Sequence, residues 1–340
     1  MRTDTTPSIL EDTIESVNAI VVAHTMAGAR VFSDADAEGQ PMTTEITQPP
    51  RWFLEAINTP YDRGSIEVEG VSINYLKWGD AQKPGVILVH GGAANAHWWA
   101  FIAPQLARNY HVIALDLSGH GDSGRRDGYP RELWSEEIMA VAADAGIVGA
   151  PILVGHSMGG FVSMSTAVRY GDRLAGAVII DSPVRRPDPE SEEGARGRAF
   201  RNPKTYATVE EARARYRLVP EQPCSNTYII DYIARHSMMN TPSGYTWKFD
   251  PIIFQNMKPR ASHELLPQVR CRIAVVRAEY GLVDPETGDY MYELLGLNSP
   301  IIEIPDAYHH VMLDQPIALI TALRALLADW EHSVPRKARP

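Results

Sequence analysis

The chain has 340 residues, of which 44% are hydrophobic and 22% charged, an ordinary balance for a globular protein. The formal net charge of −10 argues against the basic surface that nucleic-acid binding needs. The two cysteines, Cys224 and Cys271, lack metal-ligand spacing, which predicts free thiols in a reducing, cytoplasmic compartment. No stretch has the pattern of a signal peptide or a transmembrane helix, so we expect no membrane partner.

Residues 1–64 differ in pattern from the rest of the chain. Apolar positions at helical spacing predict an amphipathic helix over residues 8–30, and the polar, proline-containing residues 33–50 predict a linker. We expect this segment to be an extension that packs on the body of the protein or on a second subunit of a homodimer. A disordered arm is the alternative.

From Ser65 onward, strand patterns alternate with helical patterns. Two alternating runs, 65–69 and 71–76, predict an antiparallel hairpin with one solvated face. The continuous apolar runs typical of buried parallel strands follow at 86–89, 112–115, 152–154, 177–180, 273–276 and 301–304. Helical segments fall between most of them. The sequence therefore predicts an α/β fold, with a mostly parallel eight-stranded sheet covered by helices on both faces.

One interval breaks this alternation. About ninety residues separate the strand ending at Ile180 from the one starting near Ile273, too many for a structureless loop. Its helical patterns predict a cap inserted over the carboxyl-terminal edge of the sheet, which could also carry a homodimer contact. The predicted domains are the extension (1–64), an α/β core (65–183 and 263–333) and a helical cap (184–262).

The most informative motif, Gly155-His156-Ser157-Met158-Gly159-Gly160, lies between a predicted strand and a predicted helix. A serine at such a tight turn needs small residues two positions before and two after it, because larger side chains would collide with the sheet and the helix. The helix N-terminus beneath Ser157 would favour developing negative charge. The motif predicts that Ser157 is a nucleophile.

A second motif, His90-Gly91-Gly92-Ala93-Ala94-Asn95, follows the first buried strand. The backbone N–H of Gly92, or alternatively of Ala93, could join that of Met158 in an oxyanion hole. A plain Gly-rich turn is the competing interpretation. Ala93 and the residues after it are expected to border a substrate pocket; these are Asn95, His97, Trp98 and Trp99.

A third motif, residues 116–124, is a Gly-rich turn that contains His120, which we interpret as a structural residue of the turn. It has neither the spacing of a dinucleotide fingerprint nor the lysine of a P-loop. We expect no cofactor and no metal. A general base is expected after the last strand, where His309 and His310 compete and where a helix starts at Pro316.

Four segments together resemble the α/β-hydrolase superfamily over about residues 65–333: HGGAAN, LDLSGHGDSG, GHSMGG and IPDAYHHVMLDQP. Members usually end in a Gly-x-Gly-His motif followed seven residues later by proline. Counting back from Pro316 implies His309 as the base. Asp306 and Tyr308 stand where the motif has glycines, which is a departure from the family pattern.

The resemblance leaves the triad acid open. Most relatives carry an aspartate on the loop after the seventh strand, at a position that Tyr280 or Gly281 occupies here, with Glu279 and Asp284 beside it. Some haloalkane dehalogenases carry the acid after the sixth strand instead, where this chain has Asp181. We take Asp181 as the first candidate and keep Asp284 and Glu279 as alternatives.

These residues predict a hydrolase that cleaves a carboxylic ester in a small acyl substrate. Ser157, deprotonated by His309, attacks the carbonyl carbon, and the amides of Gly92 and Met158 stabilise the oxyanion. Water activated by His309 then cleaves the acyl-enzyme. Trp247, in the aromatic-rich residues 245–251, could line the acyl site or pack the cap on the core.

Serine at the nucleophile position argues against dehalogenation and the usual epoxide opening, which the superfamily performs with aspartate. The same residues could hydrolyse a lactone, an amide, a carbamate or a carbon–carbon bond, or perform perhydrolysis. Carbon–carbon hydrolases typically carry a longer Gly-Pro-Gly oxyanion loop, which HGGAAN lacks. A ligand receptor or signalling module with a vestigial triad, or a catalytically dead interaction protein, is the alternative of another class.

Overall fold

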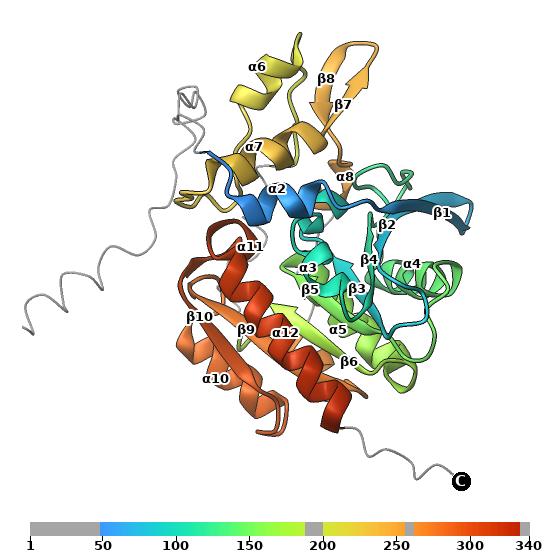
Figure 1. The fold of residues 1–340 in the computed structure, drawn as a ribbon, viewed down its shortest axis with the longest axis vertical. Helices are drawn as coiled ribbons and strands as arrows, with labels where there is room; N and C mark the ends of the chain where they lie inside the picture. The colour runs from blue at the N-terminus through green and yellow to red at the C-terminus, as the bar shows by residue number, and fades with distance from the viewer. Residues whose placement is uncertain (1–47, 188–199, 256–261, 334–340) are drawn as a thin grey trace, which may run out of the picture. The chain divides into compact units, whose positions relative to one another are not determined.

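The computed structural model describes residues 48–187, 200–255 and 262–333 (Figure 1). The predicted helix over residues 8–30 and nearly all of the predicted linker lie outside these ranges. The part of the predicted extension that is described holds helix α2 (Arg51–Ile57) and the start of the first strand. Phe53 of α2 is buried and packs edge-on against Tyr228, so this helix is part of the body.

An eight-stranded sheet forms the centre of the fold, with the order β1-β2-β4-β3-β5-β6-β9-β10. Only the pairs β1–β2 and β2–β4 are antiparallel, and all the others are parallel. The predicted α/β sheet is therefore confirmed. Its strands are β1 (Asp62–Val68), β2 (Val71–Trp78), β3 (Gly85–Val89), β4 (His111–Leu115), β5 (Ile152–His156), β6 (Gly176–Ile180), β9 (Arg272–Tyr280) and β10 (Ile301–Tyr308).

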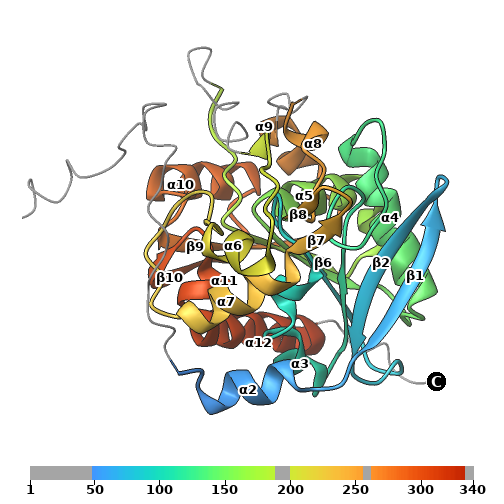
Figure 2. The same cartoon turned by 90° about the horizontal axis from the view of Figure 1, so that it is seen from above.

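Helices cover both faces of the sheet (Figures 1 and 2). Because successive side chains of a strand point to opposite faces, β3 supplies both layers of the core: Val86 and Leu88 to one, Ile87 and Val89 to the other. Each of these side chains is fully buried, which contributes about 1.5–3 kcal/mol apiece. The first layer includes α3 (Ala103–Ala107) and α12 (Pro316–Ser333); the second includes α4 (Arg131–Asp144), α5 (Met158–Tyr170) and α10 (Pro285–Leu294).

The chain between β6 and β9, called here the β6–β9 segment, contains helices and also a two-stranded hairpin that the helical pattern did not predict. Its described elements are α6 (Val209–Ala214), α7 (Thr227–His236), β7 (Met238–Thr241), β8 (Gly244–Trp247), α8 (Ile252–Gln255), α9 (Ser262–Leu265) and the 3-10 turn η5 (Leu266–Gln268). Helix α7 ends at His236, and the next residues, 238–241, pair with β8 instead of continuing the helix.

The β6–β9 segment is bonded to loops at the carboxyl ends of the parallel strands. The Asn95 side chain, after β3, donates to Ser237 Oγ at 3.0 Å. Asn226 donates to the carbonyl of Leu313 at 2.8 Å, in the short helix α11 (Val311–Asp314) that follows β10. These contacts place the segment beside the edge of the sheet where the candidate catalytic residues lie.

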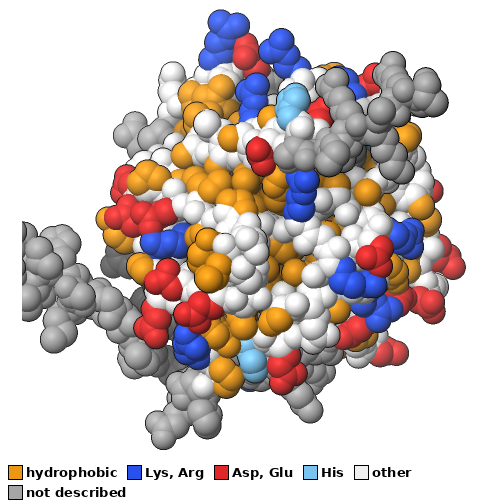
Figure 3. Space-filling model, turned by 90° about the horizontal axis from the view of Figure 1, so that it is seen from below, with side chains coloured by type: hydrophobic (Ala, Val, Ile, Leu, Met, Phe, Trp, Pro, Cys, Tyr) orange, Lys and Arg blue, Asp and Glu red, His pale blue; other side chains and the backbone are white. Residues whose placement is uncertain are grey.

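No helix of the described residues is long and apolar enough to cross a membrane. Figure 3 shows the side of the molecule opposite α6 and the β7–β8 hairpin, where apolar side chains lie in patches among acidic and basic ones.

Candidate active site

The turn between β5 and α5 holds Ser157 in a strained backbone conformation, with φ 54° and ψ −118°. A Cβ atom on Gly155 would lie 2.4 Å from the carbonyl oxygen of Gly159, and one on Gly159 would lie 2.4 Å from that of Val89. Glycine is therefore required on both sides of the serine because the strands and the helix approach so closely. The turn leaves Ser157 partly exposed at the carboxyl end of β5.

Ser157 is the first member of a chain of hydrogen bonds. Its hydroxyl donates to Nε2 of His309 at 2.9 Å, and Nδ1–H of His309 donates to Oδ2 of Asp181 at 2.8 Å. The three residues come from the turn after β5, the end of β10 and the end of β6. This arrangement can move the hydroxyl proton to the imidazole while the carboxylate holds the ring in the required tautomer.

Asp181 is fully buried and adopts a positive φ of 44° directly after β6. Burial on its own raises the pKa of its carboxyl group. The hydrogen bond from His309 and those from the backbone amides of Leu282 (2.7 Å) and Val283 (3.1 Å) outweigh burial, so the pKa lies below its usual value. The side chain is therefore a carboxylate at neutral pH.

The two alternative carboxylates, Asp284 and Glu279, lie elsewhere and are exposed. Asp284 caps the N-terminus of α10 by accepting a bond from the amide of Thr287 at 2.7 Å. Glu279 accepts a bond from the amide of Asp306 at 2.8 Å. The structure thus brings Asp181, the first candidate, against His309 and gives the other two different partners.

Of the two adjacent histidines, His309 faces Ser157 and His310 faces away from it. His310 is buried and packs edge-on against Trp98 at 5.4 Å. Burial and the neighbouring imidazoles of His309 and His156 hold the pKa of His310 well below its usual value, so it stays neutral.

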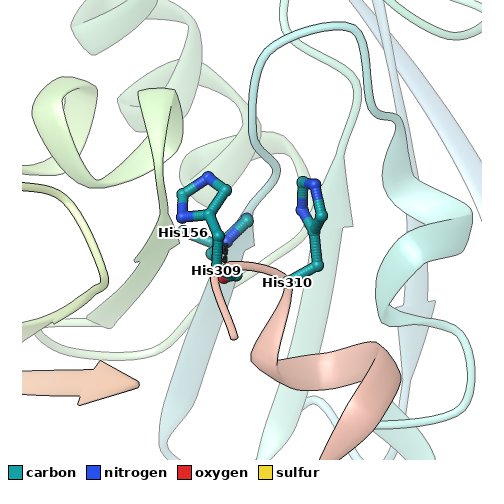
Figure 4. Close-up of side chains that lie close together, drawn as sticks. All are labelled: His156, His309 and His310. Atoms are coloured by element: carbon teal, nitrogen blue, oxygen red, sulfur yellow. Dashed lines mark hydrogen bonds between the residues drawn. The ribbon is translucent and has the colours of Figure 1, made fainter. Parts of the chain in front are cut away.

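His156, the residue before the serine, lies next to His309 and is hydrogen-bonded to it (Figure 4). Its Nε2–H donates to the backbone carbonyl of His309 at 2.8 Å, which fixes the position of the residue that accepts the serine proton. Burial and the imidazole of His309 lower the pKa of His156, so the ring remains neutral.

His156, His309 and His310 also form a group of potential metal ligands, with nitrogens within 4.8 Å of one another. Imidazole suits zinc and copper. However, both ring nitrogens of His309 already bond to Ser157 and Asp181, and one of His156 bonds to a carbonyl. A metal held by all three would break the bond of His309 to either Ser157 or Asp181, so the group suits proton transfer better.

The Gly-rich loop after β3 is held by His90, which accepts from the amide of Leu117 at 3.1 Å and donates from Nδ1–H to the carbonyl of Gly91 at 2.7 Å. The loop runs beside the start of α5: a Cβ on Gly92 would lie 3.8 Å from Cβ of Met158. The two residues predicted to supply oxyanion amides are therefore neighbours. Ala93, the alternative donor, adopts a positive φ of 58°.

The predicted substrate-binding residues have varied surroundings. Ala93 is partly exposed beside Gly92. Asn95 is buried and caps the 3-10 turn η2 (Ala96–Trp99), while Trp98 is buried against His310. Trp247 is partly buried in β8 and contacts the rings of Tyr206 and Tyr216. His97 and Trp99 are buried as well. Of these six residues, Ala93 and Trp247 are the ones that are partly exposed.

The family model for the alpha/beta hydrolase family matches residues 86–323, which contain Ser157, Asp181 and His309. The chain belongs to this family. Esterase Rv0045c of Mycobacterium tuberculosis is 36% identical over 116 residues, which are 34% of this chain and 38% of that protein. Fluoroacetate dehalogenase of Burkholderia sp. is 31% identical over 127 residues, 36% of this chain and 41% of that protein. These matches span well under half of each relative.

Solved structures match over a larger part of this α/β hydrolase. E-2-(acetamidomethylene)succinate hydrolase superposes with a TM-score of 0.69 and 20% identity, covering 79% of this chain and all of that one. The thioesterase domain from the curacin biosynthetic pathway gives a TM-score of 0.65 and 19% identity, covering 78% of this chain and all of that one. At these identities, the likeness shows the fold alone.

Three residues of the site were not predicted from the sequence. His156 lies inside the serine motif, and its place directly before Ser157 was the signal that could have indicated a role in the site. Gly281 is one of two residues, with Tyr280, at the place where the family resemblance expects the acid, and a Cβ on Gly281 would lie 2.4 Å from Oδ1 of Asp181. The lack of a carboxylate at either residue was the available signal for an acid elsewhere. Phe254, from α8, lies beside Gly92, and no sequence pattern pointed to it.

Proposed function

We propose that this α/β hydrolase cleaves carboxylic esters of small molecules through an acyl-enzyme on Ser157. The observation that carries the proposal is the hydrogen-bond chain from Ser157 through His309 to Asp181, with distances of 2.9 and 2.8 Å. A hydroxyl, an imidazole and a buried carboxylate in this order are the parts that nucleophilic acyl transfer requires.

In the first half of the reaction, the Ser157 oxygen forms a bond with the carbonyl carbon as its proton passes to Nε2 of His309. The amides of Gly92 and Met158 would stabilise the oxyanion, aided by the N-terminus of α5. The bond to the leaving alcohol then breaks, and His309 returns the proton to the alcohol oxygen. Asp181 stabilises the imidazolium that exists between these two transfers.

In the second half, water loses a proton to His309 and attacks the acyl carbon. The bond between the carbon and Ser157 breaks, the serine regains its proton and the carboxylic acid leaves. His156, through the carbonyl of His309, would hold the imidazole in place during both halves.

A serine rather than an aspartate at the turn after β5 separates this chain from dehalogenase and epoxide-opening chemistry, although relatives with those names match it. Lactone, amide, carbamate and carbon–carbon bond hydrolysis, and perhydrolysis, would use the same residues. A panel of these substrates, compared by kcat/KM, decides among them.

The direct test is the hydrolysis of p-nitrophenyl acetate and butyrate by the wild type and by Ser157→Ala. We expect turnover by the wild type and a loss of at least about 10³-fold in kcat for the variant. Ser165→Ala is the matched control, because Ser165 is a buried serine of the same helix, and it should retain turnover. If Ser157→Ala retains wild-type turnover, or the wild type has none, the proposal fails and the receptor alternative becomes the better account.

A further inference from the structure

Phe254, on α8, touches the loop that is proposed to bind the substrate carbonyl. A Cβ atom on Gly92 would lie 3.1 Å from Cε1 and 3.4 Å from Cζ of Phe254, so the edge of the ring is in contact with Gly92. The same point lies 3.8 Å from Cβ of Met158. The neighbouring loop residue, Gly91, lies against Ser157, since its Cβ would be 3.4 Å from the serine Cβ. Phe254 and Ser157 therefore contact adjacent residues of the same loop, Gly92 and Gly91.

The backbone that carries Phe254 is fixed to the core. The amide of Gly121 donates to the carbonyl of Lys248 at 2.8 Å, and the amide of Asp250 donates to the carbonyl of Gly119 at 2.7 Å. The Asp250 carboxylate then accepts from the hydroxyl of Tyr129 at 2.7 Å and from the amide that begins α8 at 3.1 Å. These bonds tie the start of α8 to the turn after β4.

Other aromatic rings hold the Phe254 ring in place. Its centroid lies 4.6 Å from that of Phe200 and 5.8 Å from that of Phe249, and the His120 ring lies edge-on at 6.5 Å. Only 3% of Phe254 is exposed, so the ring can move only if these neighbours move with it. It is a rigid apolar wall.

We propose that Phe254 limits the acyl group of the substrate to a short chain, so that the natural substrates are esters of small carboxylic acids. This inference rests on the proposed ester hydrolysis. A carbonyl carbon bonded to Ser157, with its oxygen at the amides of Gly92 and Met158, brings the acyl chain close to the Phe254 ring. Each extra methylene must then fit a space that the ring already occupies, and packed interiors accommodate such additions poorly.

The test compares kcat/KM for p-nitrophenyl acetate, butyrate, hexanoate and octanoate. For the wild type we expect a fall of about 10-fold or more from butyrate to octanoate, the scale on which pockets discriminate methylenes. Phe254→Ala should raise the ratio of octanoate to acetate by about 10-fold or more. Phe254→Leu should give an intermediate shift. Because each ratio is internal to one protein, it does not depend on how much of a variant is folded.

Phe249→Ala is the matched control. Phe249 belongs to the same aromatic group, whereas the atoms nearest to the Cβ position of Gly92 belong to Phe254 and Met158. Phe249→Ala should shift the ratio less than Phe254→Ala, because it loosens the packing but keeps the Phe254 ring beside Gly92. The inference is overturned if the wild type prefers octanoate, or if Phe249→Ala and Phe254→Ala shift the ratio equally. Absence of turnover with every ester refutes the proposed function and this inference together, whereas ester turnover with an unchanged ratio refutes the inference alone.

Discussion

The loops after β6 and β9 leave neighbouring parallel strands of the sheet, yet they contribute to the site in different ways. The β6 loop supplies a buried carboxylate, Asp181. The β9 loop, taken here with the last two residues of its strand, carries two exposed carboxylates, Glu279 and Asp284, and it supplies backbone amides, from Leu282 and Val283, that bind Asp181. One loop provides the charge and the other provides its hydrogen-bond donors.

Gly281 shows why the two roles cannot be exchanged by a single substitution. Its position in the β9 loop is occupied at close range by the Asp181 carboxylate, and any Cβ there would lie 2.4 Å from Oδ1. A side chain at residue 281 would therefore have to displace the Asp181 carboxylate. The β6 loop can hold the acid in this position because the β9 loop has no side chain at residue 281.

The largest effect is expected from Asp181→Asn. An amide in this position can no longer stabilise the imidazolium of His309 and favours the wrong tautomer, so kcat for p-nitrophenyl butyrate should fall by about 10⁴-fold. The measurement is steady-state kinetics at neutral pH.

Asp284→Asn and Glu279→Gln are the controls in the β9 loop, and each should stay within about 3-fold of the wild type because their partners are backbone amides away from His309. A collapse of turnover in either, with Asp181→Asn active, would reverse the assignment.

A smaller effect is expected from Gly281→Ala. The added methyl group must displace the Asp181 carboxylate, and displacements of this size cost about 10²-fold in kcat. Gly281 does not have a positive φ, so alanine causes no backbone strain there. In an Asp181→Asn background the same substitution should lower kcat much less, because the carboxylate that it would displace is no longer present. If Gly281→Ala lowers kcat by the same factor in the wild type and in Asp181→Asn, Gly281 acts independently of Asp181.

The smallest effect is expected in the pH dependence of the unfolding free energy, to which the buried imidazole of His90 contributes. Burial lowers the pKa of His90 to about 4, so the folded protein leaves it neutral where the unfolded chain, with a histidine pKa near 6.5, binds a proton. The stability from His90 is thus complete above pH 6.5 and is lost as pH falls toward 4, at about 1.4 kcal/mol per pH unit.

Urea unfolding between pH 5 and 6.5 measures this contribution. His90→Asn should reduce the slope of the unfolding free energy against pH by about 1.4 kcal/mol per unit. An unchanged slope in His90→Asn would mean that the folded protein can bind a proton at His90 in this range, which would contradict the effect assigned to burial.

The sequence predicted those parts of the protein that depend on local pattern. Ser157 and the sheet follow from short motifs and apolar runs, since a strand, a tight turn and a helix are adjacent in the chain. The acid could only be narrowed to three residues, because its choice depends on which loop reaches His309 in space. The β7–β8 hairpin and Phe254 were not predicted, because both depend on contacts between segments that are far apart in sequence.

The central claim is that Ser157 becomes acylated, and its most direct test is rapid quenching of the enzyme during turnover of p-nitrophenyl butyrate, followed by mass spectrometry of the peptide that carries Ser157. The account predicts that this peptide gains one butyryl group, and that the modification is absent in Ser157→Ala. Turnover without any acylated peptide, or with the acyl group on another residue, would contradict it.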